Sequence, residues 1–114
     1  MNKIESLALA QLARKALLDK KSVNPLLLDV RKLSSVADYY LIATGNSVPH
    51  LKAMAEELNH QLRDAGADRK RRAGEANSGW LVVDHHSVVV HLFLPQTREY
   101  YALEELWSDA SRVE

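Results

Sequence analysis

The sequence predicts a single α/β domain over residues 1–114, with a mixed β-sheet flanked by helices. Three observations predict the α/β class. Segments with helical spacing of apolar residues alternate with short β-branched or aromatic segments. Two of those short segments follow each other closely, as in an antiparallel hairpin. The length fits one core, and 46% apolar with 26% charged residues is typical of a globular domain.

The first half of the chain predicts a helix, two strands and a second helix. Apolar residues at helical spacing predict an amphipathic helix in the first twenty residues, and Asn24-Pro25 ends this region because proline disfavours helix in the residue before it. Apolar segments at 26–30 and 38–44 are typical of buried strands. Ser47 can cap a helix whose C-terminal end we expect at Gly66.

The second half is expected to begin with a basic candidate strand at 68–73 and a polar linker at 74–79. A strand pair with β-branched and aromatic residues should follow, and it is considered separately below. After Pro95 the apolar spacing becomes helical again and predicts a last helix over 99–111.

The strand pair at 80–84 and 88–94 predicts a hairpin joined by the residues between. Tight hairpin turns need positive φ, which glycine or asparagine normally supplies. This connection has neither, so we expect His85 or His86 to adopt the positive φ.

Composition narrows the classes of partner. The 15 basic and 15 acidic residues give a formal charge of zero, which argues against binding that depends mainly on nucleic-acid phosphates. The chain has no cysteine, and its longest apolar segment, 88–94, is too short to span a bilayer. The N-terminus lacks the features of a signal peptide, so we expect a cytoplasmic protein without membrane contact.

The histidines do not form a convincing metal site. His85, His86, His91 and Asp84 lie close in sequence, but neighbouring residues of a strand point to opposite faces and no HExxH-like spacing occurs. Surface histidines explain the pattern better. We therefore expect neither a metal nor another cofactor.

Two enzyme readings remain weak. The turn from Thr44 to Ser47 lies between a strand and a helix, where backbone N–H groups can bind an anion, but it has one glycine and lacks a full phosphate-binding motif. A nucleotide-binding or nucleotidyltransferase-like enzyme using this turn is the alternative function. Ser34, Ser35 and Asp38 carry no sequence signature of a nucleophile–base pair, because no GxSxG elbow is present.

The basic run at 69–72 has two interpretations. It is typical of an edge strand, whose charges discourage pairing with other sheets, and it could also contact the phosphate backbone of RNA. The neutral chain favours the first interpretation. The two interpretations are compatible if the partner of the protein is itself embedded in RNA.

Aromatic residues point to a protein-binding surface between residues 80 and 107. In a helix, Leu103, Leu106 and Trp107 share one face, and core packing explains the two leucines. Trp80 starts a strand after a polar linker, so we expect it to be half-exposed. Tyrosine and tryptophan dominate the energetics of protein interfaces.

Several ordered blocks stand out along the sequence: LDVR at 28–31, LSSVADY at 33–39, IATGNS at 42–47 (leading to His50), GWLVVD at 79–84, VVVHLF at 88–93 and REYYALEELW at 98–107. In these blocks and their order the sequence resembles the Iojap family, the ribosomal silencing factors. The resemblance extends over nearly the whole chain from about residue 9.

The resemblance implies a nucleotidyltransferase-like fold without that activity, and homodimers off the ribosome. It also implies binding to the large ribosomal subunit through ribosomal protein fourteen, which blocks subunit joining and represses translation when nutrients are scarce. The docking residues implied here are Trp80 and Tyr101, with a polar rim of Asp84, Arg98 and Glu104. One departure is the hairpin turn, where the family has glycine and aspartate and this chain has His86 and Ser87.

Overall fold

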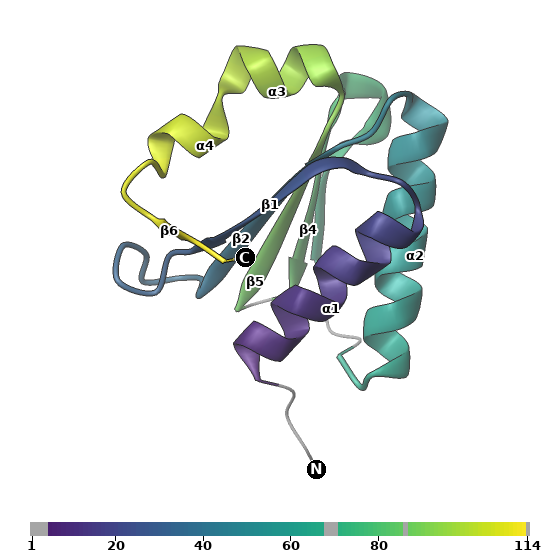
Figure 1. The fold of residues 1–114 in the computed structure, drawn as a ribbon. Helices are drawn as coiled ribbons and strands as arrows, with labels where there is room; N and C mark the ends of the chain where they lie inside the picture. Colours follow the sequence, from purple (N-terminus) through teal and green to yellow (C-terminus); the bar gives the residue numbers. More distant parts are fainter. Residues whose placement is uncertain (1–4, 68–70, 86, 114) are drawn as a thin grey trace.

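The computed structural model has one mixed sheet with helices on both faces, as the sequence predicts (Figure 1). It describes residues 5–67, 71–85 and 87–113, and the statements below refer to these residues. The elements in chain order are α1 (Ser6–Asp19), β1 (Val23–Asp29), β2 (Tyr39–Thr44), α2 (Val48–Asp64), β3 (Arg71–Glu75), the 3-10 helix η1 (Ala76–Ser78), β4 (Trp80–His85), β5 (Val88–Phe93), α3 (Pro95–Tyr101), α4 (Leu103–Leu106) and β6 (Ser111–Arg112).

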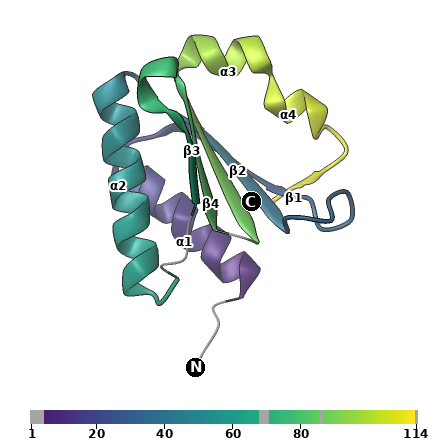
Figure 2. The same cartoon turned by 180° about the vertical axis from the view of Figure 1, so that it is seen from behind.

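The described strands form a six-stranded sheet in the order β3-β4-β5-β2-β1-β6. The pair β2–β5 is parallel, and the other neighbouring pairs are antiparallel. The chain passes from β2 to β5 by way of α2 and the β3–β4 pair, which Figure 2 shows from behind. This order places β5 and β2 at the centre of the sheet and leaves β3 at one edge.

One face of the sheet is sealed by α1 and α2, whose apolar stripes pack on alternate residues of the strands. The predicted ends of α2 are confirmed. The Ser47 hydroxyl accepts a hydrogen bond from the His50 backbone N–H at 3.1 Å, Pro49 falls in the first turn, and Gly66 has a φ of +86°. The buried residues of the two helices are Leu9, Ala10, Ala13, Ala16, Leu17, Leu51, Met54, Ala55, Leu58 and Leu62.

The other face carries a smaller apolar cluster covered by the C-terminal segment. Its buried members include Ile42 and Phe93 from the central strands, and Leu103 and Trp107 pack against them. Neither α3 nor α4 has a fully buried residue. The second face is therefore covered by side chains that remain partly in solvent.

The predicted helix over 99–111 is wrong in both its start and its end. The helix starts at Pro95, which is tolerated in a first turn, and breaks at Ala102, which has a left-handed φ of 45°. The chain turns after Leu106 and adds the short strand β6 beside β1. The sequence predicts that Leu106 packs in the core. This prediction is wrong, because α4 is only one turn long and leaves Leu106 75% exposed.

The strands also extend beyond their predicted ends. β1 begins at Val23 and includes Pro25, because a register shift between Val23 and Leu26 and a φ of 47° at Asn24 let the chain bulge there. β3 pairs with β4 as far as Glu75, where the sequence predicts a linker. The candidate basic strand therefore exists and reaches further along the chain than predicted, and residues 68–70 of the prediction lie outside the described residues.

The hairpin is confirmed, with His85 opposite Val88 in the register of β4 and β5. His85 does not adopt the positive φ expected of it, because it is the last paired residue of β4 and keeps a strand conformation. The same expectation for His86 lies outside the described residues. Within the described part of the chain, no helix combines the length and apolarity that crossing a bilayer requires.

Candidate functional site

The fold brings Trp80 and Tyr101 into contact on the second face of the sheet. Trp80 starts β4 and points to this face, while Tyr101 ends α3 above it. Their ring centroids are 4.6 Å apart at an interplanar angle of 44°, and Trp80 also stacks on Phe93 at 5.1 Å. Trp80 is half-buried, as predicted, and Tyr101 is 51% exposed. The two rings thus form a supported aromatic surface that reaches solvent.

A hollow of about 300 Å³ opens beside these rings, lined by Trp80, Tyr101, Val82, Ser78 and Gly74. Gly74 has a φ of +75°, and a Cβ there would lie 2.4 Å from the Trp80 carbonyl oxygen. Glycine is therefore required where β3 passes the start of β4. The hollow therefore adjoins the aromatic surface directly.

His91 supports Trp80 from below. The Trp80 Nε1–H donates a hydrogen bond to His91 Nδ1 at 3.2 Å. Burial lowers the pKa of His91 from 6.5 to about 4, against an opposing effect of nearby Asp84. The expectation of surface histidines is wrong for His91, which is 8% exposed, and for His85, which is 4% exposed, because both faces of the sheet are covered at these positions.

Asp84 lies on the same face of β4 as Trp80, two pleats away, and is half-buried. In the strand register it stands between Val89 of β5 and Arg71 of β3. Its negative charge, together with the larger effect of burial, raises the pKa of the Tyr40 hydroxyl. Asp84 thus gives the aromatic surface an acidic side.

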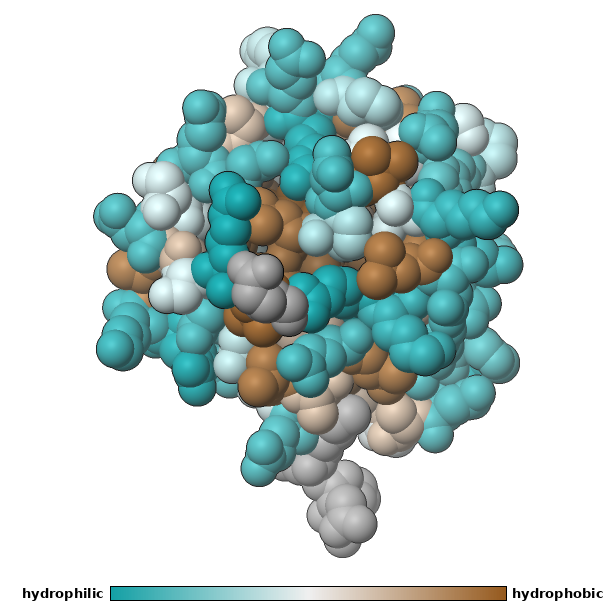
Figure 3. Space-filling view, in the orientation of Figure 1, coloured by the Kyte–Doolittle hydropathy of each residue, from teal (hydrophilic) through white to brown (hydrophobic). Residues whose placement is uncertain are grey.

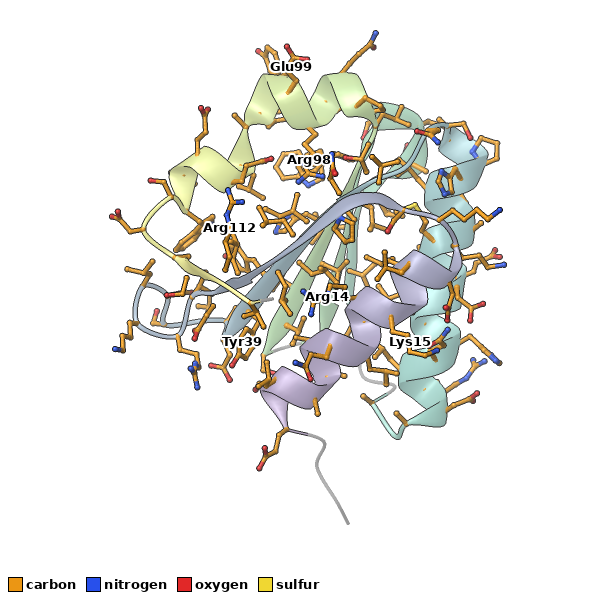
Figure 4. All side chains as sticks on the ribbon, viewed as in Figure 1. Arg14, Lys15, Tyr39, Arg98, Glu99 and Arg112 are labelled. Carbon is orange, nitrogen blue, oxygen red and sulfur yellow. The ribbon has the colours of Figure 1, made fainter. Side chains whose placement is uncertain are left out.

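Arg98 points inward from α3 toward the strands, whereas neighbouring Glu99 points away (Figure 4). The Arg98 side chain is 13% exposed and donates to Glu104 Oε2 at 3.0 Å. It also donates to the Asn24 carbonyl oxygen and to Thr44 Oγ1, each at 2.9 Å. These contacts tie α3 and α4 to the bulge of β1 and the end of β2.

Sequence reasoning identified Arg98 and Glu104 but not the two residues that complete their contacts. The sequence indicates for Asn24 only a role in ending a helix beside Pro25, and for Thr44 only a place at the end of a strand and the start of a turn. An asparagine before proline in an otherwise apolar strand is a signal for a bulge, and bulges commonly expose a carbonyl oxygen to another element.

The turn at 44–47 has little capacity left for an anion. The N–H groups of Gly45 and Asn46 donate to the Phe93 carbonyl oxygen at 2.9 Å and to His50 Nδ1 at 2.8 Å. A Cβ on Gly45 would lie 2.8 Å from a Leu51 methyl group, so close packing explains this glycine. The adjoining hollow of about 560 Å³ is lined by three glutamates, Glu99, Glu104 and Glu105, and by Arg98, whose charge is paired with Glu104. Among the described residues, no group of three or more histidines or carboxylates is arranged to hold a metal ion.

The basic run at 69–72 coincides in part with the sheet edge. The backbone of Arg71 and Arg72 lies in β3, at the edge of the sheet, which agrees with the edge-strand interpretation. Arg69 and Lys70 lie outside the described residues. On the face shown in Figure 3, hydrophobic patches are separated by hydrophilic side chains.

Comparisons with known proteins agree with the resemblance of the sequence. The model of the family "Ribosomal silencing factor during starvation" matches residues 3–114. The "Ribosomal silencing factor RsfS" of Halalkalibacterium halodurans is 41% identical over 106 residues, which cover 93% of this chain and 91% of that protein. The mouse "Mitochondrial assembly of ribosomal large subunit protein 1" is 39% identical over 74 residues, covering 62% of this chain and 32% of that one.

Solved structures match the fold as well. A crystal structure of a protein from Chromobacterium violaceum matches with a TM-score of 0.88 and 37% sequence identity. The match covers 92% of this chain and 88% of that protein's chain. A second, from Bacillus halodurans, has a TM-score of 0.82 at 37% identity, covering 95% and 98%. With a family model that spans almost the full length and relatives alike in sequence and fold, this chain belongs to the family of ribosomal silencing factors.

Proposed function

We propose that this protein binds the large ribosomal subunit in the cytoplasm through ribosomal protein fourteen. Bound there, it prevents the small subunit from joining and so represses translation when nutrients are scarce. The action is steric and involves no chemical step. Family membership supports the ribosomal role, and the contact between Trp80 and Tyr101 at the solvent-facing side of the sheet is the observation that carries the docking surface.

The docking surface, as we propose it, has an aromatic centre and a polar rim. Trp80 and Tyr101 present a large ring area that Phe93 supports from below, as is typical of the central residues of interfaces. Asp84 and the exposed part of Glu104 supply the rim. Arg98, at 13% exposure, contributes mainly by holding Glu104 and the end of α3 in place.

The test is co-sedimentation of purified protein with large ribosomal subunits, followed by an assay of subunit joining. We expect Trp80→Ala and Tyr101→Ala each to weaken binding by at least about 30-fold, because central aromatic residues contribute roughly 2 kcal/mol or more. Both variants should then fail to block joining.

Leu18→Ala is the matched control. Leu18 is 51% exposed, like Tyr101, but lies on α1 at the opposite face of the sheet. We expect it to bind as the wild type does, with circular dichroism confirming the fold of all three variants. Wild-type affinity in both aromatic variants would place the docking surface elsewhere.

A peripheral contact between the basic run at 69–72 and ribosomal RNA completes the proposed complex. Each phosphate contact makes affinity depend more steeply on salt. We expect replacement of Arg71 and Arg72 with alanine to make the affinity for the large subunit depend less steeply on salt concentration, and to leave the aromatic contribution intact. An unchanged salt dependence would contradict the RNA contact and leave ribosomal protein as the proposed partner.

Off the ribosome we propose a homodimer, on the family resemblance alone. Light scattering coupled to size-exclusion chromatography measures its mass directly, and a single monomeric species at micromolar concentration would contradict it.

A further inference from the structure

The orientation of the Trp80 side chain depends on one hydrogen bond. Stacking on Phe93 and the tilted contact with Tyr101 fix the plane of the indole, but a half-turn about χ2 keeps that plane and exchanges the two edges of the ring. The bond from Trp80 Nε1–H to His91 Nδ1, at 3.2 Å, removes that freedom. It therefore determines which edge of the indole faces solvent.

His91 is suited to accept this bond continuously. An indole N–H can only donate, so His91 Nδ1 must be unprotonated and the neutral ring carries its proton on Nε2. The ring is 8% exposed, and its burial disfavours a charge, which keeps it neutral near pH 7. Tyr40 packs against it edge-on, with ring centroids 5.3 Å apart, and fixes the imidazole in turn.

We infer that His91 is a positioning residue of the docking surface, which holds the Trp80 indole in the orientation that the partner meets. The inference rests on the proposed function of Trp80. It adds a residue that does not itself touch the partner. An indole that already has its bound orientation avoids the conformational entropy cost of ordering the side chain when the partner binds.

Two isosteric variants separate the hydrogen bond from packing. In His91→Asn the side-chain oxygen can occupy the place of Nδ1, whereas His91→Leu has the same branched shape and no acceptor. The first measurement needs no ribosome: the indole ¹H–¹⁵N resonance of Trp80, assigned by its loss in Trp80→Phe. We expect this resonance to keep its hydrogen-bonded shift in His91→Asn and to move, with faster solvent exchange, in His91→Leu.

The second measurement is affinity for large ribosomal subunits. We expect His91→Leu to bind about tenfold more weakly than the wild type, which corresponds to the loss of one hydrogen bond, and His91→Asn to recover most of that affinity. Trp80→Phe lacks the N–H and part of the ring area, so it should lose at least this factor. The double variant Trp80→Phe with His91→Leu should lose no more than Trp80→Phe alone, because the hydrogen bond is already absent there.

The outcomes distinguish the inference from the function beneath it. Two results would overturn the positioning role even though Trp80→Ala still abolishes binding. One is a loss of affinity in the double variant equal to the product of the two single losses. The other is wild-type affinity in His91→Leu although the Trp80 resonance has moved. Wild-type affinity in Trp80→Ala would remove the proposed docking surface itself. If His91→Leu does not fold, Trp80→Phe still tests the inference, since an affinity equal to that of the wild type in this variant contradicts it.

Discussion

At the scale of single residues, the buried histidine His91 makes the stability of this protein sensitive to mild acid. Its pKa is about 4 in the folded chain and 6.5 when burial is absent. As the pH falls below 6.5, the unfolded chain takes up a proton that the folded chain does not. Protonation therefore favours unfolding, and the stabilisation that is complete above pH 6.5 declines as the pH falls toward 4.

We expect the wild type to lose roughly 2 to 3 kcal/mol more of its free energy of unfolding than His91→Asn between pH 7 and pH 4.5. Urea unfolding at several pH values measures the difference. Asp29, whose pKa is lowered by hydrogen bonds from Arg31, affects stability mainly below pH 3.8 and is present in both proteins. Parallel stability curves for the two proteins would show that His91 titrates normally in the folded state.

Single residues also show what the sequence could and could not predict. The Ser47 cap and the half-buried position of Trp80 follow from local chemistry and from strand ends, so the sequence predicts both. The burial of His91 does not follow. Alternation along a strand predicts two faces, but it does not tell whether a distant segment covers the second face. Here Trp107 and Leu103 do so from the end of the chain.

At the scale of elements, the segment formed by α3 and α4 is held by few contacts. Neither helix has a fully buried residue, and Ala102 between them takes a left-handed conformation that is unfavourable for a residue with a Cβ. The inward contacts of Arg98 offset this cost. They also place Tyr101 over Trp80, so the geometry of the docking surface depends on them.

We expect Arg98→Ala to loosen this segment without unfolding the sheet. The variant loses three hydrogen bonds and leaves Glu104 without its ion pair in a half-buried place, which we estimate at roughly 2 to 3 kcal/mol. Hydrogen exchange followed by mass spectrometry should show faster exchange at 95–107 and unchanged exchange in α2.

Glu99→Ala is the control, because Glu99 is the next residue of the same helix and points into solvent (Figure 4). It should leave exchange at 95–107 unchanged. Equal exchange in Arg98→Ala and the wild type would mean that the apolar packing of Leu103 and Trp107 holds the segment without the contacts of Arg98.

Elements differ in how well the sequence predicts them, for a physical reason. α2 has a cap, a long apolar stripe and a terminal glycine, and each indicates the same helix. The last helix has an apolar pattern that continues through Ala102 and carries no glycine to mark the break. Its interruption accompanies tertiary contacts of Arg98 with β1 and β2, which a local pattern does not contain.

At the scale of the whole molecule, two apolar layers share one sheet. Successive residues of β5 serve opposite layers, as Leu92 faces α1 and α2 while Phe93 faces the C-terminal segment. Loss of the sheet therefore removes the support of both layers at once. We infer that the chain unfolds in one cooperative step.

Two optical probes test this cooperativity. Far-ultraviolet circular dichroism reports mainly α1 and α2, whereas fluorescence reports Trp80 and Trp107, both on the second layer. We expect the two urea transitions to coincide. A fluorescence transition at clearly lower urea would mean that the C-terminal segment detaches while the rest of the fold persists.

The parallel pair of β2 and β5 at the centre of the sheet has a consequence for how the chain assembles during its own synthesis. β1 and β2 can pair as soon as both have left the ribosome, but the partner of β2 on its other side is separated by α2 and the β3–β4 pair. Pairings that distant in sequence form slowly, because a long loop must close first. We therefore expect one edge of β2 in the growing chain to stay unpaired until β5 emerges. The outer strands pair first, and the central pair β2–β5 forms last.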